Sequence, residues 1–327
     1  FNRQEGVEFA ELNYIAETQF IPNDAYYSYQ WNFDGHYTGP LMNLQTVINL
    51  NTDDPDTYSS SGSAGMQKGV SHLLQVWFYH HLTDRWGAVP YSEALKGVDN
   101  LKPKFDSQQA IYTGMFAQID AALAMLDGGG LEGDFMFNGD AAKWKKFGNT
   151  MKMVMALRIS DADASTAQSK FMEAHNGGVI GAGGDIHYPY TAADANDAPW
   201  QDRFQSRDDF ASSDTMVEHL IASSDPRLHV YMKPVEQAGG VAGGAAKVVV
   251  NYTTVDGKVY GGMPYGVLTP GILQSWVSYL PDAVIRVSAA RQGGMLFSYA
   301  QVAFCYSEAA HRGWIPAASG TKQQWDE

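Results

Sequence analysis

The side chains best suited to ligand chemistry are aromatic rings that lie outside the helical patterns and close to polar residues. A sugar ring has an apolar C–H face and a rim of hydroxyls, so a flat aromatic ring beside amides or carboxylates complements both. Such rings occur in three segments: Tyr26, Tyr27, Tyr29, Trp31, Phe33 and Tyr37; Tyr188, Tyr190 and Trp200, near Asp194, Asn196, Asp197 and Gln201; Tyr260 and Tyr265, around a Gly-Gly-Met-Pro turn. We predict ligand contacts at Trp31, Trp200, Tyr260 and Tyr265. The alternative for each ring is that it anchors its loop in the core.

Two glycine-rich stretches resemble nucleotide-binding motifs only in part. Gly128-x-Gly130-x-x-Gly133 has the letters of a dinucleotide fingerprint, but it follows a predicted helix instead of a strand. Residues 239–247 lack the Gly-Lys-Ser/Thr ending of a phosphate loop. The first stretch is therefore interpreted as a helix C-cap and loop and the second as a flexible turn, and no cofactor is predicted.

The histidine and aspartate residues that could bind a metal also lack the spacing that a metal site needs. His80 and His81 are adjacent, so on a helix they point about 100° apart. Asp53, Asp54 and Asp56 are not followed by the glycine and distal glutamate of a calcium loop. We predict no metal site and interpret these carboxylates as solvated.

Paired carboxylates leave one catalytic alternative open. Glycoside hydrolysis needs two carboxyl groups about 5–5.5 or 6.5–9.5 Å apart across a sugar site. The chain has 36 acidic residues, and sequence alone does not measure such separations. A glycoside hydrolase on a helical scaffold is therefore the alternative to a binding protein with no catalytic residue.

Charge and cysteine content exclude other classes. The net charge is −14, and the densest basic stretch is only Lys143, Lys145 and Lys146, so a nucleic-acid partner is not expected. Cys305 is the single cysteine, which excludes an intrachain disulfide and predicts a small buried side chain.

No apolar run approaches the ~18 residues that span a bilayer. A signal peptide or lipid-anchor cysteine would precede Phe1.

Hydrophobic periodicity predicts the elements that must position these side chains. Helices are expected at 41–50, at 66–82, from a cap at Asp106-Ser107 to residue 126, and from 138–140 to 157. A shorter helix is expected to follow and to end at residue 175. Two more are expected at 212–222 and 294–312. A hairpin is expected from Lys247 through a turn at Gly257, and loops at 51–65 and 179–207. The successive helix pairs indicate stacked helical hairpins without a strict repeat period.

Six stretches, in this order, resemble the SusD/RagB family, and its SusD-like branch in particular. They are Leu82–Leu95 (LTDRWGAVPYSEAL), Lys102–Tyr112 (KPKFDSQQAIY), Gly139–Asn149 continuing to Ala156-Leu-Arg158, Asp225–Leu228 (DPRL), Tyr260–Gly266 (YGGMPYG) and Ser298–Ile315 (SYAQVAFCYSEAAHRGWI). The last run is expected to be a scaffold helix, with close packing through Phe297, Ala300, Phe304 and the Ala309-Ala310 pair, and with Gly313 as its stop.

The resemblance implies a mainly α fold, in which tetratricopeptide-like helix pairs pack against a loop-rich irregular half with a minor β-hairpin. Residues 1–327 would form a single domain that continues at both ends, with the scaffold mainly at 41–175 and 294–315 and the loop-rich ligand side at 176–293. The family's ligand residues follow no fixed motif, so the four predicted contacts depend on the aromatic pattern alone.

The resemblance also implies a function. The protein would be a bacterial outer-membrane lipoprotein on the cell-surface side, attached to the membrane only through an anchor that precedes Phe1. It would capture oligosaccharide, or a peptide nutrient, without breaking bonds, and deliver it to a TonB-dependent transporter of the SusC type. A helical-repeat scaffold that binds another protein is the third alternative.

Overall fold

Most of the regular structure in the computed structural model is helical. The structure describes residues 15–17, 33–191, 198, 204, 210–236, 238, 250–264, 274–281 and 293–315. The chain divides into two compact units, one of residues 31–188 and 295–327 and the other of residues 1–30 and 189–294. The predicted assignment of residues 1–327 to a single domain stays a prediction.

The first unit, here the helical unit, holds the long helices. They are α2 (Asp34–His36), α3 (Met42–Asp53), α4 (Ala64–Trp86), α5 (Gln108–Met125), α6 (Ala141–Arg158), α7 (Ala164–Gly177) and α12 (Tyr299–His311). A π-helical turn, Tyr37–Leu41, joins α2 to α3, and short 3₁₀ turns occupy Ser59–Ser61 and Gly97–Asp99. No helix among the described residues is long and apolar enough to cross a membrane.

Polar side chains start five of these helices by accepting a hydrogen bond from a backbone N–H of the first turn. The caps are Ser63 for α4, Ser107 for α5, Asp140 for α6, Asp163 for α7 and Ser298 for α12. The predicted cap at Ser107 is confirmed, with Ala110 N 3.2 Å from its Oγ. Local sequence therefore determines where each scaffold helix begins.

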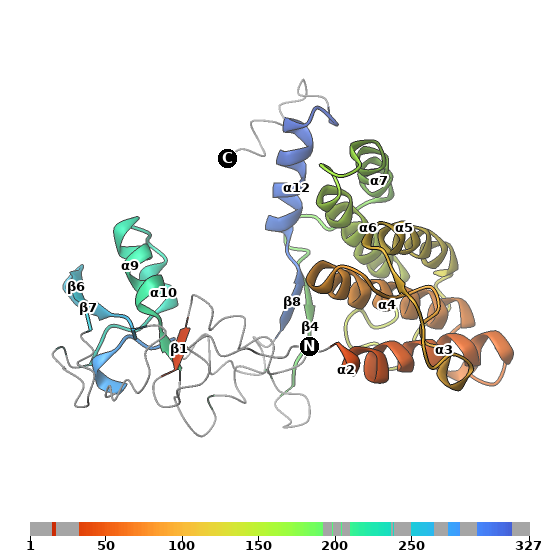
Figure 1. The fold of residues 1–327 in the computed structure, drawn as a ribbon, viewed down its shortest axis with the longest axis horizontal. Helices are drawn as coiled ribbons and strands as arrows, with labels where there is room; N and C mark the ends of the chain where they lie inside the picture. The colour runs from red at the N-terminus through yellow and green to blue at the C-terminus, as the bar shows by residue number, and fades with distance from the viewer. Residues whose placement is uncertain are drawn as a thin grey trace. The chain divides into compact units, whose positions relative to one another are not determined.

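The long helices pack as successive pairs, α4 with α5 and α6 with α7, and α12 packs beside α6 (Figure 1). This arrangement confirms the predicted tetratricopeptide-like scaffold. One continuous core runs through the pairs, and its largest fully buried side chains include Trp144, Phe147 and Phe171. Cys305 is buried in the same core, as predicted, and burial raises the pKa of its thiol to about 12.

Glycines allow the helices to approach closely. A Cβ atom added at Gly69 of α4 would lie 2.8 Å from Leu126 Cδ2 and 3.0 Å from Ala122 O. One added at Gly148 of α6 would lie 2.9 Å from Leu73 Cδ2, on α4. A side chain at Gly69 would therefore press against the Ala122 carbonyl oxygen, whereas one at Gly148 would require the Leu73 side chain to move.

Two small sheets complete the helical unit. Strand β2 (Val89–Pro90) pairs antiparallel with β3 (Phe105–Asp106), and β4 (Ile186–Tyr188) pairs with β8 (Gly294–Phe297). The sequence prediction of helix from residue 294 is wrong for the first four residues, because they pair with β4 and the helix begins only after the Ser298 cap. The expected packing of Ala300 and Phe304 is also wrong. Both are exposed, and Phe304 is 75% exposed.

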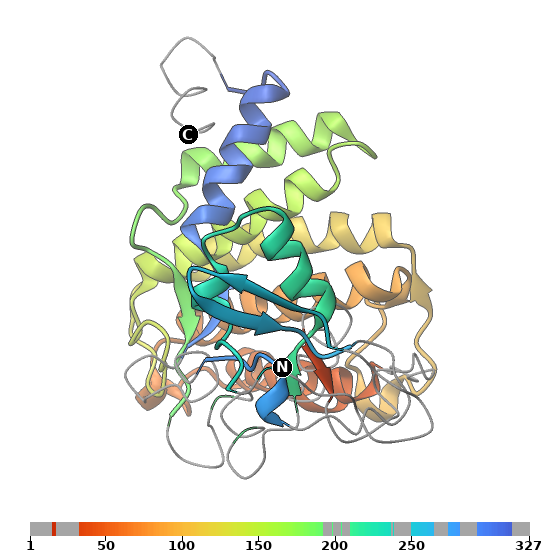
Figure 2. The same ribbon diagram turned by 90° about the vertical axis from the view of Figure 1, so that its left-hand side faces the viewer.

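The second unit, here the loop-rich unit, contains shorter elements. They are β1 (Ile15–Glu17), β5 (Phe210–Ser212), α9 (Asp214–Ala222), α10 (Leu228–Tyr231), β6 (Tyr252–Val255), β7 (Lys258–Gly261) and a 3₁₀ turn, Gln274–Trp276. Strand β1 pairs antiparallel with β5, and β6 with β7 through the turn at Asp256-Gly257 (Figure 2). Two small apolar clusters hold these elements, one around Met263 and one around Tyr260.

Several predicted boundaries shift. Helix α3 continues to Asp53 and α4 starts at Ala64, so both ends of the predicted 51–65 loop are helical. The predicted hairpin is confirmed at Gly257, but its first strand starts at Tyr252, and residues 247–249 lie outside the described residues. Ser212 belongs to β5 instead of the helix that follows. Each shift moves an element end by a few residues and leaves its type unchanged.

Replacing Gly69 by alanine tests the close approach of α4 to α5. Gly69→Ala should lower the free energy of unfolding by up to about 2 kcal/mol, because an overpacking cost of about 1–3 kcal/mol exceeds the ~1 kcal/mol that alanine adds to helix preference. Urea unfolding followed by circular dichroism measures this. The matched control is Gly35→Ala in α2, where an added Cβ meets nothing within 4 Å, so stability should be unchanged or slightly higher. Equal stabilities for the two variants would show that Gly69 does not limit the packing.

Candidate functional site

The structure locates one of the four predicted ligand contacts. Trp31, Trp200 and Tyr265 lie outside the described residues. Tyr260 lies in β7 and is 1% exposed. Its burial favours the alternative in which the ring anchors its loop, and its contact with ligand stays a prediction.

Tyr260 takes part in a hydrogen-bonded chain. His229 Nδ1 lies 2.7 Å from the Tyr260 hydroxyl, and His229 Nε2 lies 3.1 Å from Asp256 Oδ2. Burial, and secondarily the charge of Asp256, raises the pKa of Tyr260. The hydroxyl is therefore a neutral hydrogen-bonding group that ties α10 to the hairpin.

The larger hollow of the helical unit lies between α5 and the turn from α6 to α7, and has a volume of about 750 Å³. Ligand pockets range from about 300 to 1,000 Å³. Its lining combines amides, hydroxyls, charged groups and a few apolar side chains: Asp84, Gln108, Gln109, Tyr112, Thr113, Phe116, Ala117, Asp120, Arg158, Ile159, Ala162, Asp163, Thr166 and Lys170. Both aromatic residues of this lining, Tyr112 and Phe116, are buried.

Asp84 is the centre of a polar cluster at this hollow. It accepts a hydrogen bond from the Tyr112 hydroxyl at 2.5 Å, and both His80 Nε2 and Arg158 Nη1 lie 3.0 Å from its Oδ2. Burial alone would raise the pKa of Asp84, but the hydrogen bonds and charges of these three partners together hold it below the usual value. Asp84 is therefore a stable carboxylate.

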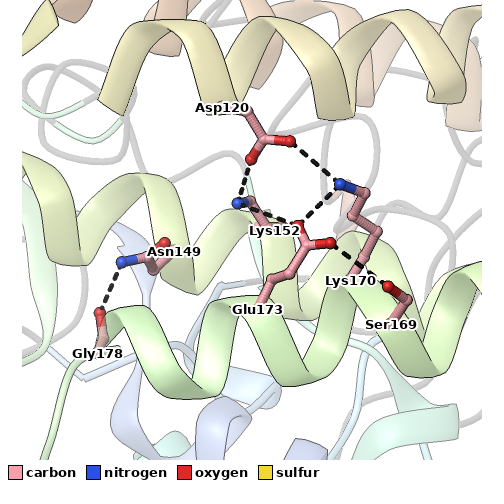
Figure 3. A network of polar contacts seen from close by, with 7 residues as sticks. All are labelled: Asp120, Asn149, Lys152, Ser169, Lys170, Glu173 and Gly178. Atoms are coloured by element: carbon pink, nitrogen blue, oxygen red, sulfur yellow. Dashed lines mark hydrogen bonds and ion pairs between the residues drawn. The ribbon is translucent and has the colours of Figure 1, made fainter. Parts of the chain in front are cut away.

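Asp120 is the centre of a second cluster, which joins α5, α6 and α7 (Figure 3). Its carboxylate pairs with the buried Lys152 ammonium and with Lys170 Nζ, at 3.1 Å in the second case. Glu173 lies 2.8 Å from Lys170 Nζ and 3.8 Å from Lys152 Nζ. Burial would raise the pKa of Asp120, but the two lysines lower it. Two cations and two anions thus neutralise one another.

These clusters bear on the hydrolase alternative. A glycosidase needs one carboxyl group whose pKa is raised, so that it can donate a proton to the leaving group. The pKa values of the three carboxyls that line the larger hollow, Asp84, Asp120 and Asp163, are all lowered. None of them can serve as that acid near neutral pH. Among the described residues, no group of three or more His, Cys, Asp or Glu side chains could hold a metal ion.

A smaller hollow of about 360 Å³ lies beside the loop that joins α5 to α6. Its lining is richer in aromatic and apolar groups: Val47, Ser61, Gln67, Val70, Ser71, Leu74, Leu131, Glu132, Gly133, Asp134, Phe135, Met136, Trp144 and Tyr188. Tyr188 belongs to an aromatic segment that the sequence pattern indicated. Phe135 was not predicted. Its signal in the sequence is a large apolar residue inside a Gly-rich turn segment, where no core position is expected.

Asp134 fixes the shape of this loop. Its carboxylate accepts hydrogen bonds from the backbone N–H groups of Met136, Phe137 and Gly139 at 2.9–3.1 Å, and from Trp144 Nε1 at 2.8 Å. Glycines at 128, 130 and 133 adopt positive φ angles of 74–82°. The glycine motif therefore lies in the loop that follows α5, as predicted, and this loop builds one wall of the smaller hollow.

Stacked helix pairs with a polar hollow, in which Asp84 and Asp120 are paired, and a second, more apolar hollow are the features of a helical-repeat binding protein. The sequence profile of the SusD-like family, described as "Starch-binding associating with outer membrane", matches residues 2–327, so the chain belongs to this family. Proteins of this family are non-catalytic binding proteins associated with the outer membrane. A search among curated proteins finds no match.

Solved structures with the same fold agree with this assignment. A chitin-binding protein is 24% identical, with a TM-score of 0.73 over 97% of this chain and 67% of that one. A chitin-binding SusD homologue from Flavobacterium johnsoniae is 22% identical, with a TM-score of 0.72 over 99% and 64%. A SusD homologue from Bacteroides vulgatus is 23% identical, with a TM-score of 0.71 over 98% and 62%. The chain spans about two thirds of the length of each, and the likeness shows the shared fold.

Asp120→Asn tests the second polar cluster. At pH 7 it should lower the free energy of unfolding by about 1–3 kcal/mol, because the buried Lys152 ammonium loses its main partner. The loss of stability should lie toward the lower end of this range, because Asp120 is partly exposed and Glu173 remains close to the Lys152 ammonium. The matched control is Asp161→Asn, which breaks an exposed pair with Arg312 and should cost no more than ~0.5 kcal/mol.

The difference in the free energy of unfolding between wild type and Asp120→Asn should depend on pH. The folded pKa of Asp120 is depressed, so its stabilising contribution is present above the unfolded pKa, about 3.9, and is lost as the pH falls through the folded value. Urea unfolding at pH 7 and pH 3 should therefore show a smaller difference at pH 3. The same small loss for Asp120→Asn and Asp161→Asn at pH 7 would contradict the assigned role of this cluster.

Proposed function

We propose that this chain binds an oligosaccharide at the cell-surface side of a bacterial outer membrane and passes it, unbroken, to a TonB-dependent transporter of the SusC type. The observation that carries the proposal is the family match across residues 2–327. The polar and aromatic character of the hollows supports it, because sugars are recognised by both kinds of group.

The ligand is proposed to be a neutral glycan. Two similar structures are described as chitin-binding, and the family description names starch. Both polymers are uncharged, and a chain with a net charge of −14 would repel acidic glycans over long range. Trp31, Trp200, Tyr260 and Tyr265 are proposed as contacts, with the ring of Tyr260 acting through the loop that it anchors.

Transfer to a transporter requires attachment at the membrane and release of intact ligand. A lipid anchor is the proposed attachment. Capture without cleavage agrees with the lowered pKa values of the described carboxyls at the larger hollow. The proposed partner would accept the glycan after this protein has concentrated it at the surface.

Calorimetry against chito-oligosaccharides, malto-oligosaccharides and short peptides tests the proposal. At least one oligosaccharide should bind, with no release of reducing ends over hours. Trp31→Ala, Trp200→Ala and Tyr265→Ala should each weaken binding about tenfold or more, or ~1.4 kcal/mol, because stacked rings dominate such contacts. Tyr231→Ala, which removes a partly exposed ring from α10, is the control and should bind as wild type does.

Three outcomes would overturn the proposal. Absence of binding to every oligosaccharide by the folded chain excludes glycan capture. Reducing-end release would favour the hydrolase alternative. Binding of a protein or peptide, with no affinity for sugars, would favour the scaffold alternative.

A further inference from the structure

Phe135 is an unusual surface residue. Its side chain is 80% exposed, although large apolar side chains normally leave water on folding. It also lines the smaller hollow, together with Tyr188 of β4, which is 53 residues away along the chain (188 − 135). Two aromatic residues from separate segments thus meet at one concave surface of the helical unit.

Two polar side chains at the same hollow have no side-chain partner among the described residues. Glu132 N donates a hydrogen bond to Ser61 O at 2.9 Å, which holds the two residues together. Within the described part of the chain, neither the Glu132 carboxylate nor the Ser61 hydroxyl makes a side-chain hydrogen bond or ion pair. They offer a strong acceptor and a combined donor and acceptor to the hydroxyl rim of a ligand.

The lining also restricts the charge of the ligand. It contains the carboxylates of Glu132 and Asp134 and no Lys, Arg or His. An anionic ligand such as a uronic acid would therefore be repelled, whereas a neutral polyol would not. The volume of about 360 Å³ is at the lower end of the range for ligand pockets and suits one sugar unit of a longer chain.

Internal hydrogen bonds hold the loop that forms the wall of the hollow. The Asp134 carboxylate accepts hydrogen bonds from the Phe137 backbone N–H and from Trp144 Nε1, and these bonds fix the turn. Gly62 forms an antiparallel bridge with Leu131. Binding to a fixed wall loses less conformational entropy than binding to a loose loop.

We propose that the hollow lined by Phe135, Tyr188, Glu132 and Ser61 is a glycan-contact site of the helical unit, which takes one neutral sugar unit. The aromatic groups contact the C–H face of the sugar, and the Glu132 carboxylate and Ser61 hydroxyl bind its hydroxyls. This site is separate from the contacts proposed at Trp31, Trp200 and Tyr265. It rests on the proposed function, because it assumes that the protein's ligand is a glycan.

Phe135→Ala and Phe304→Ala form a matched pair for the test. Both rings are exposed, 80% and 75%, and Phe304 lines neither hollow. Each variant should fold normally, because neither ring belongs to the core. In titrations of the full chain with chitotriose and maltotriose, Phe135→Ala should weaken binding about tenfold or remove one of two binding events. Phe304→Ala should match wild type.

Fluorine NMR detects the site directly, even when affinity is in the millimolar range. With 4-fluorophenylalanine at position 135, the resonance should shift saturably with chitotriose or maltotriose and should not shift with a trimer of galacturonic acid. The same label at position 304 should not respond to any of the three.

The outcomes separate this site from the general function. If wild type binds no oligosaccharide, the proposed function and this site both fail. If wild type binds and Phe135→Ala binds equally well, with no shift of the label at 135, the function stands and this site is excluded. An equal response at 135 and 304 would indicate nonspecific adsorption and would also exclude the site.

Discussion

The helical unit depends on how closely α4 can approach its neighbours. At Gly69 the backbone of α4 lies against the end of α5, and at Gly148 the backbone of α6 lies against Leu73 of α4. An added Cβ at Gly69 would meet the Ala122 carbonyl oxygen, and one at Gly148 would displace the Leu73 side chain, so both glycines favour close packing of the helices. The hollows on the surface of this unit are lined by parts of the same helices.

At the larger hollow, the charges of two carboxylates are neutralised by neighbouring side chains. Asp84 is held by three donors, and Asp120 is matched by two lysines, one of them buried. Once paired, these groups have little remaining capacity to bind or catalyse, and their main effect is to connect helices.

Sequence patterns predicted the scaffold better than the site. Long amphipathic runs and caps such as Ser107 determine helices by local physics, so α4 to α7 were found within a few residues. The strand at 294–297 was missed because its partner, β4, is distant in sequence. For the same reason the burial of Tyr260 and the exposure of Phe304 could not be predicted. Phe135 could be recognised as a candidate site residue only from the structure, in which it lines the same hollow as Tyr188.

The two units are interleaved along the chain, and this affects how the protein is made. The helical unit needs residues 295–315, because Phe297 packs on Phe147 and both Tyr306 and Trp314 pack on Phe171. Residues 189–294 must leave the ribosome first, which takes on the order of 5–20 s at about 5–20 residues per second. During that time the nascent chain exposes an unfinished core. The helical unit can therefore complete its core only after the whole of residues 189–294 has been synthesised.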